Sequence, residues 1–215
     1  MPDMSTASHP SCLNLSAEKF ATALPRPNVL VRSVAGLLGI PLAADINSPE
    51  DTGTMLRDGD ARAAVVVQTN PVIAAAYSDE FDSVLLLRIP DKQCAATELN
   101  IGTRLIAVFN YRTGPMPRDI TFGERAGNRF QNAEPLIGDL LSDDLLQLQK
   151  LKDEIPEAEW NRAARLGEET LRERPRLHRL HRPGSTHRVA GDLLITILAA
   201  VIIVVALVIG LWQFA

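Results

Sequence analysis

The residues Leu193–Phe214 form an apolar run of 22 residues that contains no charged side chain. A helix of that length extends about 33 Å at about 1.5 Å per residue, which matches a hydrocarbon core of roughly 30 Å with a modest tilt. A helix buried in a globular core rarely has this length without a polar face. The run therefore predicts a single transmembrane helix over residues 193–214 that anchors the chain as a tail anchor.

Basic side chains precede this span. Because arginines close to a span stay on the cytoplasmic side, they predict a cytoplasmic N-terminal domain and a C-terminus at the opposite face of the membrane. Each arginine beside an anionic leaflet can also contribute about 1 kcal/mol of binding, so we predict contact with the membrane surface, with an orientation signal alone as the alternative. The arginines are Arg172, Arg174, Arg176, Arg179, Arg182 and Arg188.

One face of the predicted span carries small side chains. At 100° per residue they lie within an arc of about 120°, and small faces let helix backbones approach closely in lipid. We therefore predict contact with a partner helix or with a second copy of the chain in a homodimer. The residues of this face are Thr196, Ala199, Ala200, Ala206 and Gly210.

The charge of the chain is divided between two regions. Residues 1–170 carry 24 acidic and 16 basic side chains, a net charge of −8, whereas residues 171–192 carry a net charge of +4. Because nucleic-acid binding needs a basic surface on the folded part, this division argues against a nucleic-acid partner and favours a protein partner. Cys12 and Cys94 lie outside any Cys-x-x-Cys pattern and are expected to be free thiols.

Four runs of strand length are rich in β-branched and aromatic residues. Short connections between them favour antiparallel neighbours, and continuous apolar stretches such as Val65–Val67 indicate strands that are covered on both faces. After a flexible segment over residues 1–25, residues 26–134 are thus predicted to form a small β-rich meander or barrel-like domain. The four runs are Ala63–Thr69, Val72–Tyr77, Ser83–Ile89 and Thr103–Tyr111.

Helical periodicity begins after Pro135. An apolar stripe from Ile137 to Ile155 follows the period of a helix, and Ser142–Asp144 offers a cap for its start. Pro156 is suited to the first position of a second helix, which Pro175 ends. Residues 135–175 are therefore predicted to be two helices that pack on the β-rich core or form a stalk, followed by a basic juxtamembrane collar over residues 176–192. The predicted fold class is α+β, a small β-rich domain and two helices followed by a single C-terminal transmembrane helix.

Common catalytic and cofactor-binding motifs do not occur in the sequence, which lacks the phosphate-binding, dinucleotide-binding, zinc-protease and nucleophile-elbow patterns. No cofactor and no metal site are therefore predicted. The four histidines fall in the N-terminal segment and the basic collar, so the folded domain is not expected to hold a histidine base. Its turn acids are expected to be solvated. These acids are Asp58, Asp60, Asp79, Glu80 and Asp82.

Three functions remain open at the level of the sequence. The preferred one is a tail-anchored single-pass membrane protein with a cytoplasmic binding or adaptor domain. The first alternative is a membrane-acting effector whose span self-associates under control of the soluble domain. The second is a membrane-tethered enzyme that uses carboxylates, Tyr77 or Tyr111, since catalytic carboxylates need no linear motif.

Overall fold

The computed structural model describes residues 9–24, 48–95 and 97–183, which all belong to one compact unit, Met1–Gly184. Among these residues, none of the helices combines the length and the apolarity that crossing a bilayer requires. The predicted membrane span, its small-residue face and Arg188 lie outside the described residues.

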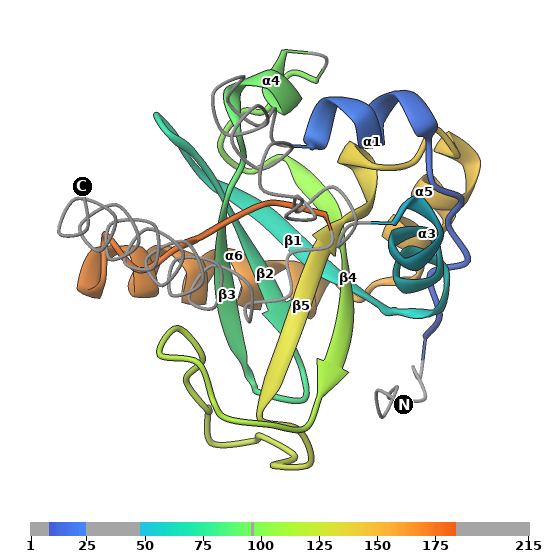
Figure 1. Ribbon diagram of the computed structural model, residues 1–215. Coiled ribbons are helices and arrows are strands. Elements are labelled where there is room, and N and C mark those ends of the chain that lie inside the picture. The colour runs from blue at the N-terminus through green and yellow to red at the C-terminus, as the bar shows by residue number, and fades with distance from the viewer. Residues whose placement is uncertain (1–8, 25–47, 96, 184–215) are drawn as a thin grey trace, which may run out of the picture. The chain divides into compact units, whose positions relative to one another are not determined.

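The unit is built on a curled, mixed six-stranded sheet with helices, an α+β architecture (Figure 1). The strand order is β5-β4-β1-β2-β3-β6, and every neighbouring pair is antiparallel except β3 and β6, which are parallel. The four strands predicted from the sequence are confirmed as β1 to β4. The strands are β1 (Asp60–Thr69), β2 (Val72–Ser78), β3 (Ser83–Arg88), β4 (Arg104–Arg112), β5 (Asn132–Ile137) and β6 (Arg179–Leu180).

Two helices follow Pro135 as predicted, α5 and α6, and α6 packs across β1, β2 and β3. The first begins later than the predicted stripe from Ile137, because residues 135–137 pair with β4 as the end of β5 and a 3-10 helix precedes α5. The backbone N–H of Gln147 donates to Asp144 at 3.0 Å, which caps α5 as predicted, and α6 begins directly after Pro156. The helical elements are α1 (Ala17–Ala23), α3 (Pro49–Asp58), α4 (Asp91–Cys94), the 3-10 helix η2 (Gly138–Leu140), α5 (Leu145–Glu154) and α6 (Glu157–Glu173).

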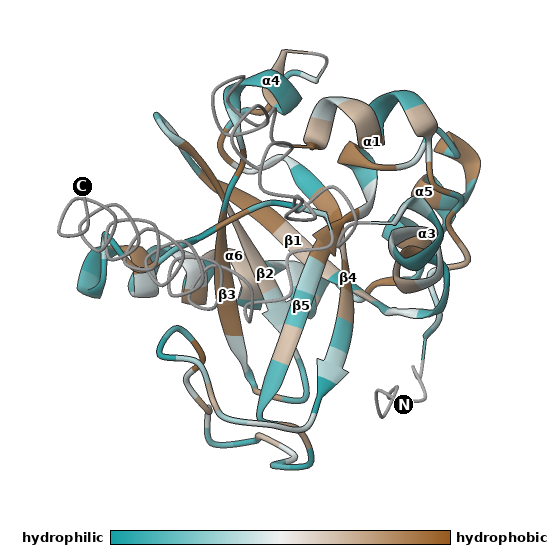
Figure 2. Ribbon diagram, in the orientation of Figure 1, coloured by the Kyte–Doolittle hydropathy of each residue, from teal (hydrophilic) through white to brown (hydrophobic). Residues whose placement is uncertain are grey.

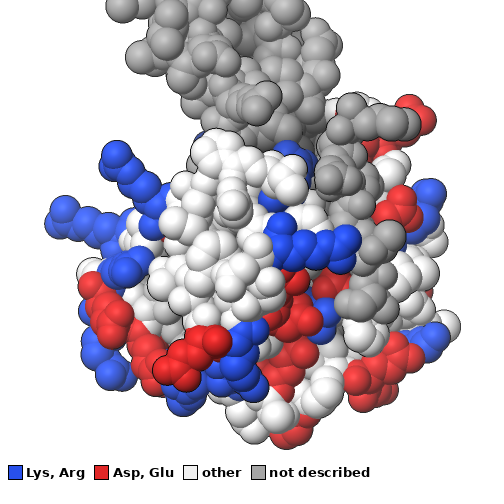
Figure 3. All heavy atoms as spheres, turned by 90° about the horizontal axis from the view of Figure 1, so that it is seen from below, with Lys and Arg blue, Asp and Glu red and all other residues white. Residues whose placement is uncertain are grey.

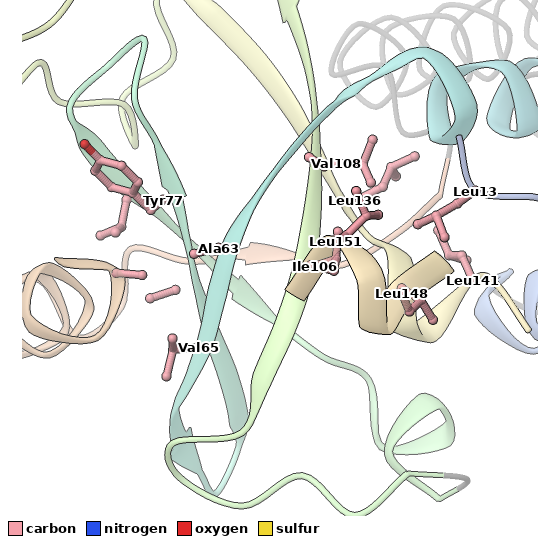
Figure 4. Close-up of a cluster of buried hydrophobic side chains, with 14 of the residues drawn as sticks. Leu13, Ala63, Val65, Tyr77, Ile106, Val108, Leu136, Leu141, Leu148 and Leu151 are labelled. Carbon is pink, nitrogen blue, oxygen red and sulfur yellow. The ribbon is translucent and has the colours of Figure 1, made fainter. Parts of the chain in front are cut away.

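Both faces of the sheet are buried, which explains why the strands are apolar without alternation. On one face, Ala63 and Val65 lie toward α6, while Ile106 and Leu136 lie toward the helix that carries Leu148 (Figure 4). The side chains of the opposite face fill the inside of the curl, together with aromatic side chains from the connection between β4 and β5. The brown colour along the central strands in Figure 2 follows this double burial.

The N-terminal segment corrects an expectation. The sequence predicts a flexible segment over residues 1–25, but residues 9–24 are packed on the unit, where Leu13 and Phe20 are buried. The backbone N–H of Lys19 donates to the side chain of Ser16, which caps α1. Leu13 is fully buried in the same apolar cluster as Ile106 and Leu148, and this burial of apolar surface stabilises the packing of the segment on the unit.

A helix, α3, precedes β1, where the sequence predicts only a β-rich domain. Ser48 accepts hydrogen bonds from the backbone of Glu50 and Asp51, Pro49 occupies the first turn, and Leu56 is fully buried. The composition of this segment indicates a loop, but its cap and the burial of Leu56 against the sheet produce a helix.

Candidate functional site

A network of charged side chains lies where β1 meets the β2–β3 turn, with Arg62 at its centre. The guanidinium lies 2.7 Å from Asp60 and 2.7 Å from Asp79, and 3.9 Å from Glu159 of α6. Burial alone would lower the pKa of Arg62, but the charges of Asp60 and Asp79 outweigh it and raise that pKa. Arg62 is therefore a permanent cation that holds a strand, a turn and a helix together.

The second polar group of this network is the hydroxyl of Tyr111, at the end of β4. It lies 2.9 Å from the Ser78 hydroxyl and donates to Asp79 at 3.4 Å. Burial raises the pKa of Tyr111 well above its ordinary value. The phenol therefore stays protonated at neutral pH and acts as a hydrogen-bond donor, not as a base.

Asp82 forms a separate node of ion pairs. Its carboxylate accepts hydrogen bonds from Tyr77 at 3.0 Å, from Arg162 of α6 at 2.6 Å and from Arg125 at 3.2 Å. Burial alone would raise the pKa of Asp82, but these donors outweigh it and lower the pKa. The connection from β4 to β5 comes so close that a Cβ on Gly123 would lie 2.3 Å from the Asp82 carbonyl oxygen.

These positions correct the expectation of solvated turn acids for two of the five. Asp60 and Asp82 are 2% and 4% exposed; Asp60 pairs with Arg62, two residues along its own strand, and Asp82 pairs with Arg162 of α6, which is distant in the sequence. As expected, two of the acids are exposed, Asp58 and Asp79. Seen from below the view of Figure 1, acidic and basic side chains alternate over the surface of the unit instead of forming a field of one sign (Figure 3). Each acid of the network contacts protein donors, and this arrangement supports the fold more than it supports proton exchange with a substrate.

A groove of about 210 Å³ opens beside this network, between β3, the C-terminal half of α6 and residues 119–123. Apolar and charged side chains line it together. The apolar lining residues are Val84, Leu86, Phe122, Leu166 and Leu177, and the charged lining residues are Asp82, Asp119, Glu169, Glu173 and Arg174.

The groove runs along a strand edge that β6 leaves partly open. β6 pairs with Leu87 and Arg88 alone, and the N–H of His181 donates to the carbonyl of Arg88 at 2.8 Å. Backbone groups alternate in direction along an antiparallel strand, so Leu86 and Val84 point theirs toward the same side as Arg88. Within the described ranges, Val84 has no strand partner on this outer side of β3.

The predicted membrane-surface arginines fall into different environments. Arg179, on β6, is 12% exposed, forms an ion pair with Asp119 and donates to the carbonyl of Ala133 at 2.6 Å. Its guanidinium thus links β6 to β5 and is not free for a lipid headgroup. Arg174 donates to Thr121 at 3.2 Å at the groove. The other arginines of this set that the structure describes are exposed, namely Arg172, Arg176 and Arg182.

His181 also lies in the folded unit, whereas the sequence places it in the basic collar outside the folded domain. Its side chain is 1% exposed, and its Nε2 accepts from the N–H of Ile137 at 3.0 Å. Nδ1 therefore carries the proton and donates to Gln93 Oε1 at 2.6 Å. Burial lowers the pKa of His181 to about 4, so the imidazole is neutral at physiological pH.

His181 and Arg179 together close the curl of the sheet, because their side chains bond to the backbone of β5 where no strand pairing occurs. The sequence does not indicate that these two residues bond to β5, since both stand in an arginine-rich segment with no apolar run. The available signal is the alternation of Arg179 and His181, which point inward, with Leu180, which is exposed.

A scan against protein-family models, a search of curated proteins and a search of solved structures each find no match for this chain.

Proposed function

We propose that this chain is a tail-anchored, single-pass membrane protein whose cytoplasmic domain binds a protein partner through the groove between β3 and α6. The observation that supports it most is the groove itself, in which apolar and charged side chains of β3, α6 and residues 119–123 lie together. Protein interfaces combine apolar groups with polar groups around them in this way.

The polar network supports binding over catalysis. A tethered enzyme would need a carboxylate or a tyrosine that meets its substrate, whereas Tyr111 and Tyr77 both donate to acids of the same unit. Arg62 and Arg162 neutralise those acids. Because each of these acids already pairs with a cation of the same unit, the ion pairs hold the segments around the groove in place, and the charges of the acids are balanced.

The membrane location rests on the sequence alone. The apolar run Leu193–Phe214 is long enough for one crossing, and the arginines that precede it favour a cytoplasmic domain. The small-residue face of the span, Ala206 and Gly210 included, adds a homodimer or a partner helix to the proposal.

The test uses the full chain in its native membranes. A photoreactive benzoylphenylalanine replaces Thr170, which lines the groove, and in a matched variant it replaces Gln149, which is exposed on α5. We expect Thr170 to crosslink one protein partner that Gln149 does not reach, and we expect alkaline carbonate to leave the chain in the membrane. Extraction of the chain by carbonate, or identical crosslinks from both positions, would contradict the proposal.

A further inference from the structure

We propose that residues 179–181, which comprise β6 and His181, form a strap that acid releases from the folded unit while the rest of the unit stays folded, with the side chain of His181 as the trigger. The inference goes beyond the proposed function, because it concerns a conformational change of the unit and not the partner that the unit binds. It follows from three features of the strap: its short backbone pairing, the hydrogen bonds of His181 and the charges around the imidazole.

The backbone alone holds the strap weakly. The two residues of β6 pair with Leu87 and Arg88 at the end of β3, whereas the other neighbouring strands pair over five or six residues. The N–H of His181 adds one hydrogen bond, to the carbonyl of Arg88 at 2.8 Å. Segments with few backbone bonds open locally at a lower free energy than central strands do. Side chains must therefore supply most of what holds the strap in place.

Two side chains fasten the strap to the unit. Arg179 forms an ion pair with Asp119 and donates to the backbone of β5. His181 differs from Arg179, because both of its bonds need the neutral ring. Its Nε2 accepts from the N–H of Ile137 at 3.0 Å, and its Nδ1 donates to Gln93 at 2.6 Å. Only a neutral imidazole provides one acceptor and one donor together.

A second proton on His181 breaks the bond to β5. Protonated Nε2 is a donor, and it would face the N–H of Ile137, which is a donor as well. Burial lowers the pKa of His181 to about 4 in the fastened strap, whereas a released ring recovers the ordinary value of about 6.5. Below about pH 6.5 the released state therefore binds more protons, and acid favours it. Release uncovers the end of β3 and the opening between β3 and β5 that the strap closes.

The charges around His181 do not offset this effect. Burial is the one cause of its pKa shift, so neighbouring charges do not stabilise the protonated ring. The acids of the adjoining segments are each paired with another cation: Asp119 with Arg179, Glu134 with Arg112, and Asp139 with Lys152. The other charged side chains of α4, of the end of β3 and of the residue after the strap are exposed, namely Asp91, Lys92, Arg88 and Arg182.

Hydrogen exchange of the full chain in detergent micelles, followed by NMR, measures the release. The amides of Ile137 and His181 report on the strap, and the amides of β2, which is paired on both sides, report on global unfolding. Protection factors divide out the intrinsic exchange rate at each pH. With the two pKa values above, one proton raises the opening constant about twentyfold between pH 7 and pH 5. We expect the protection of Ile137 and His181 to fall by this factor and to stay at least about tenfold below that of β2 at each pH.

Three variants identify the trigger. His181→Gln keeps an acceptor for Ile137 but gains no proton in this range, so the twentyfold change should be lost. His9→Gln, at an exposed histidine of the N-terminal segment, should keep the change. Asp119→Asn tests the carboxylate that Arg179 holds. It should lower protection of the strap at both pH values and leave their ratio unchanged.

Four outcomes would overturn the inference. In the wild type, these are unchanged protection of the strap between pH 7 and pH 5, or equal protection of the strap and β2, since β6 would then leave only when the whole unit unfolds. In the variants, they are a pH response that survives His181→Gln, or one that disappears with Asp119→Asn and so belongs to the carboxylate. If His181→Gln does not fold, the wild type and Asp119→Asn decide the matter.

Discussion

The close contact of α6 with the sheet predicts opposite effects for the same substitution at two helical glycines. An added Cβ on Gly167 would lie 2.4 Å from the Cβ of Ala75 and 2.9 Å from Val67, both in the strands beneath. On Gly53 of α3, the nearest atom is the Cβ of Leu15 at 3.8 Å, an ordinary van der Waals distance.

The magnitudes follow from two terms. Replacing a helical glycine with alanine gains roughly 0.5–1 kcal/mol, because alanine loses less backbone entropy on folding. At Gly167, α6 must also move by about 1 Å to restore an ordinary contact, and such overpacking typically costs about 1–3 kcal/mol. We expect Gly53→Ala to raise the free energy of unfolding by roughly 0.5–1 kcal/mol and Gly167→Ala to lower it by about 1 kcal/mol.

Urea unfolding of the full chain in detergent micelles, followed by tryptophan fluorescence, measures both changes. Trp160 is 2% exposed, at the start of α6, so its emission reports the detachment of this helix from the sheet. Equal stabilisation by both substitutions would refute the reasoning, because α6 would then not lie as close to Ala75 as the structure places it.

Three further predictions concern β6 and the C-terminal span. Arg179→Gln is expected to lower the free energy of unfolding by about 1–3 kcal/mol, since it removes the cation that pairs with the partly buried Asp119, whereas Arg182→Gln, an exposed neighbour, changes it by less than about 0.5 kcal/mol in the same urea experiment. His181 has a pKa of 6.5 when unfolded and about 4 when folded, so the unfolded state binds more protons between these values, and stability falls as the pH falls through this window, by up to about 3 kcal/mol. His181→Gln should remove this part of the pH dependence, and unfolding curves at pH 7 and pH 4.5 that keep the wild-type difference would contradict it. Ala206→Ile and Gly210→Ile are expected to abolish self-association of the span in a membrane two-hybrid assay, and an unchanged signal would refute the contact face.

The central elements of the fold were predictable because their local signals agree with their tertiary environment. β1 to β4 consist of β-branched and apolar runs that are buried on both faces, and α5 and α6 have the helical period, with the Asp144 cap before α5 and Pro156 before α6. The two edge strands were not predictable in the same way. β5 contains Pro135, which interrupts a strand pattern, and β6 has only two paired residues in an arginine-rich segment.

The candidate site depends on contacts that no local pattern carries. Arg62 meets Glu159 across 97 positions of sequence, and Arg162 meets Asp82 across 80. The same residue types in the same segments would be solvated turn acids and helix-surface arginines if the chain were curled differently. Their burial is decided only when β1, the β2–β3 turn and α6 come together.

The sequence by itself determined the four central strands, the two long helices and the separation of an acidic region from a basic, apolar C-terminal region. These properties depend on composition and periodicity, which act over a few residues at a time. The tertiary structure decided which charges are buried, which arginine of the basic segment belongs to the fold, and where the sheet leaves an open edge. Those outcomes depend on which distant segments meet, because burial and pairing are properties of the packed molecule and not of any one segment.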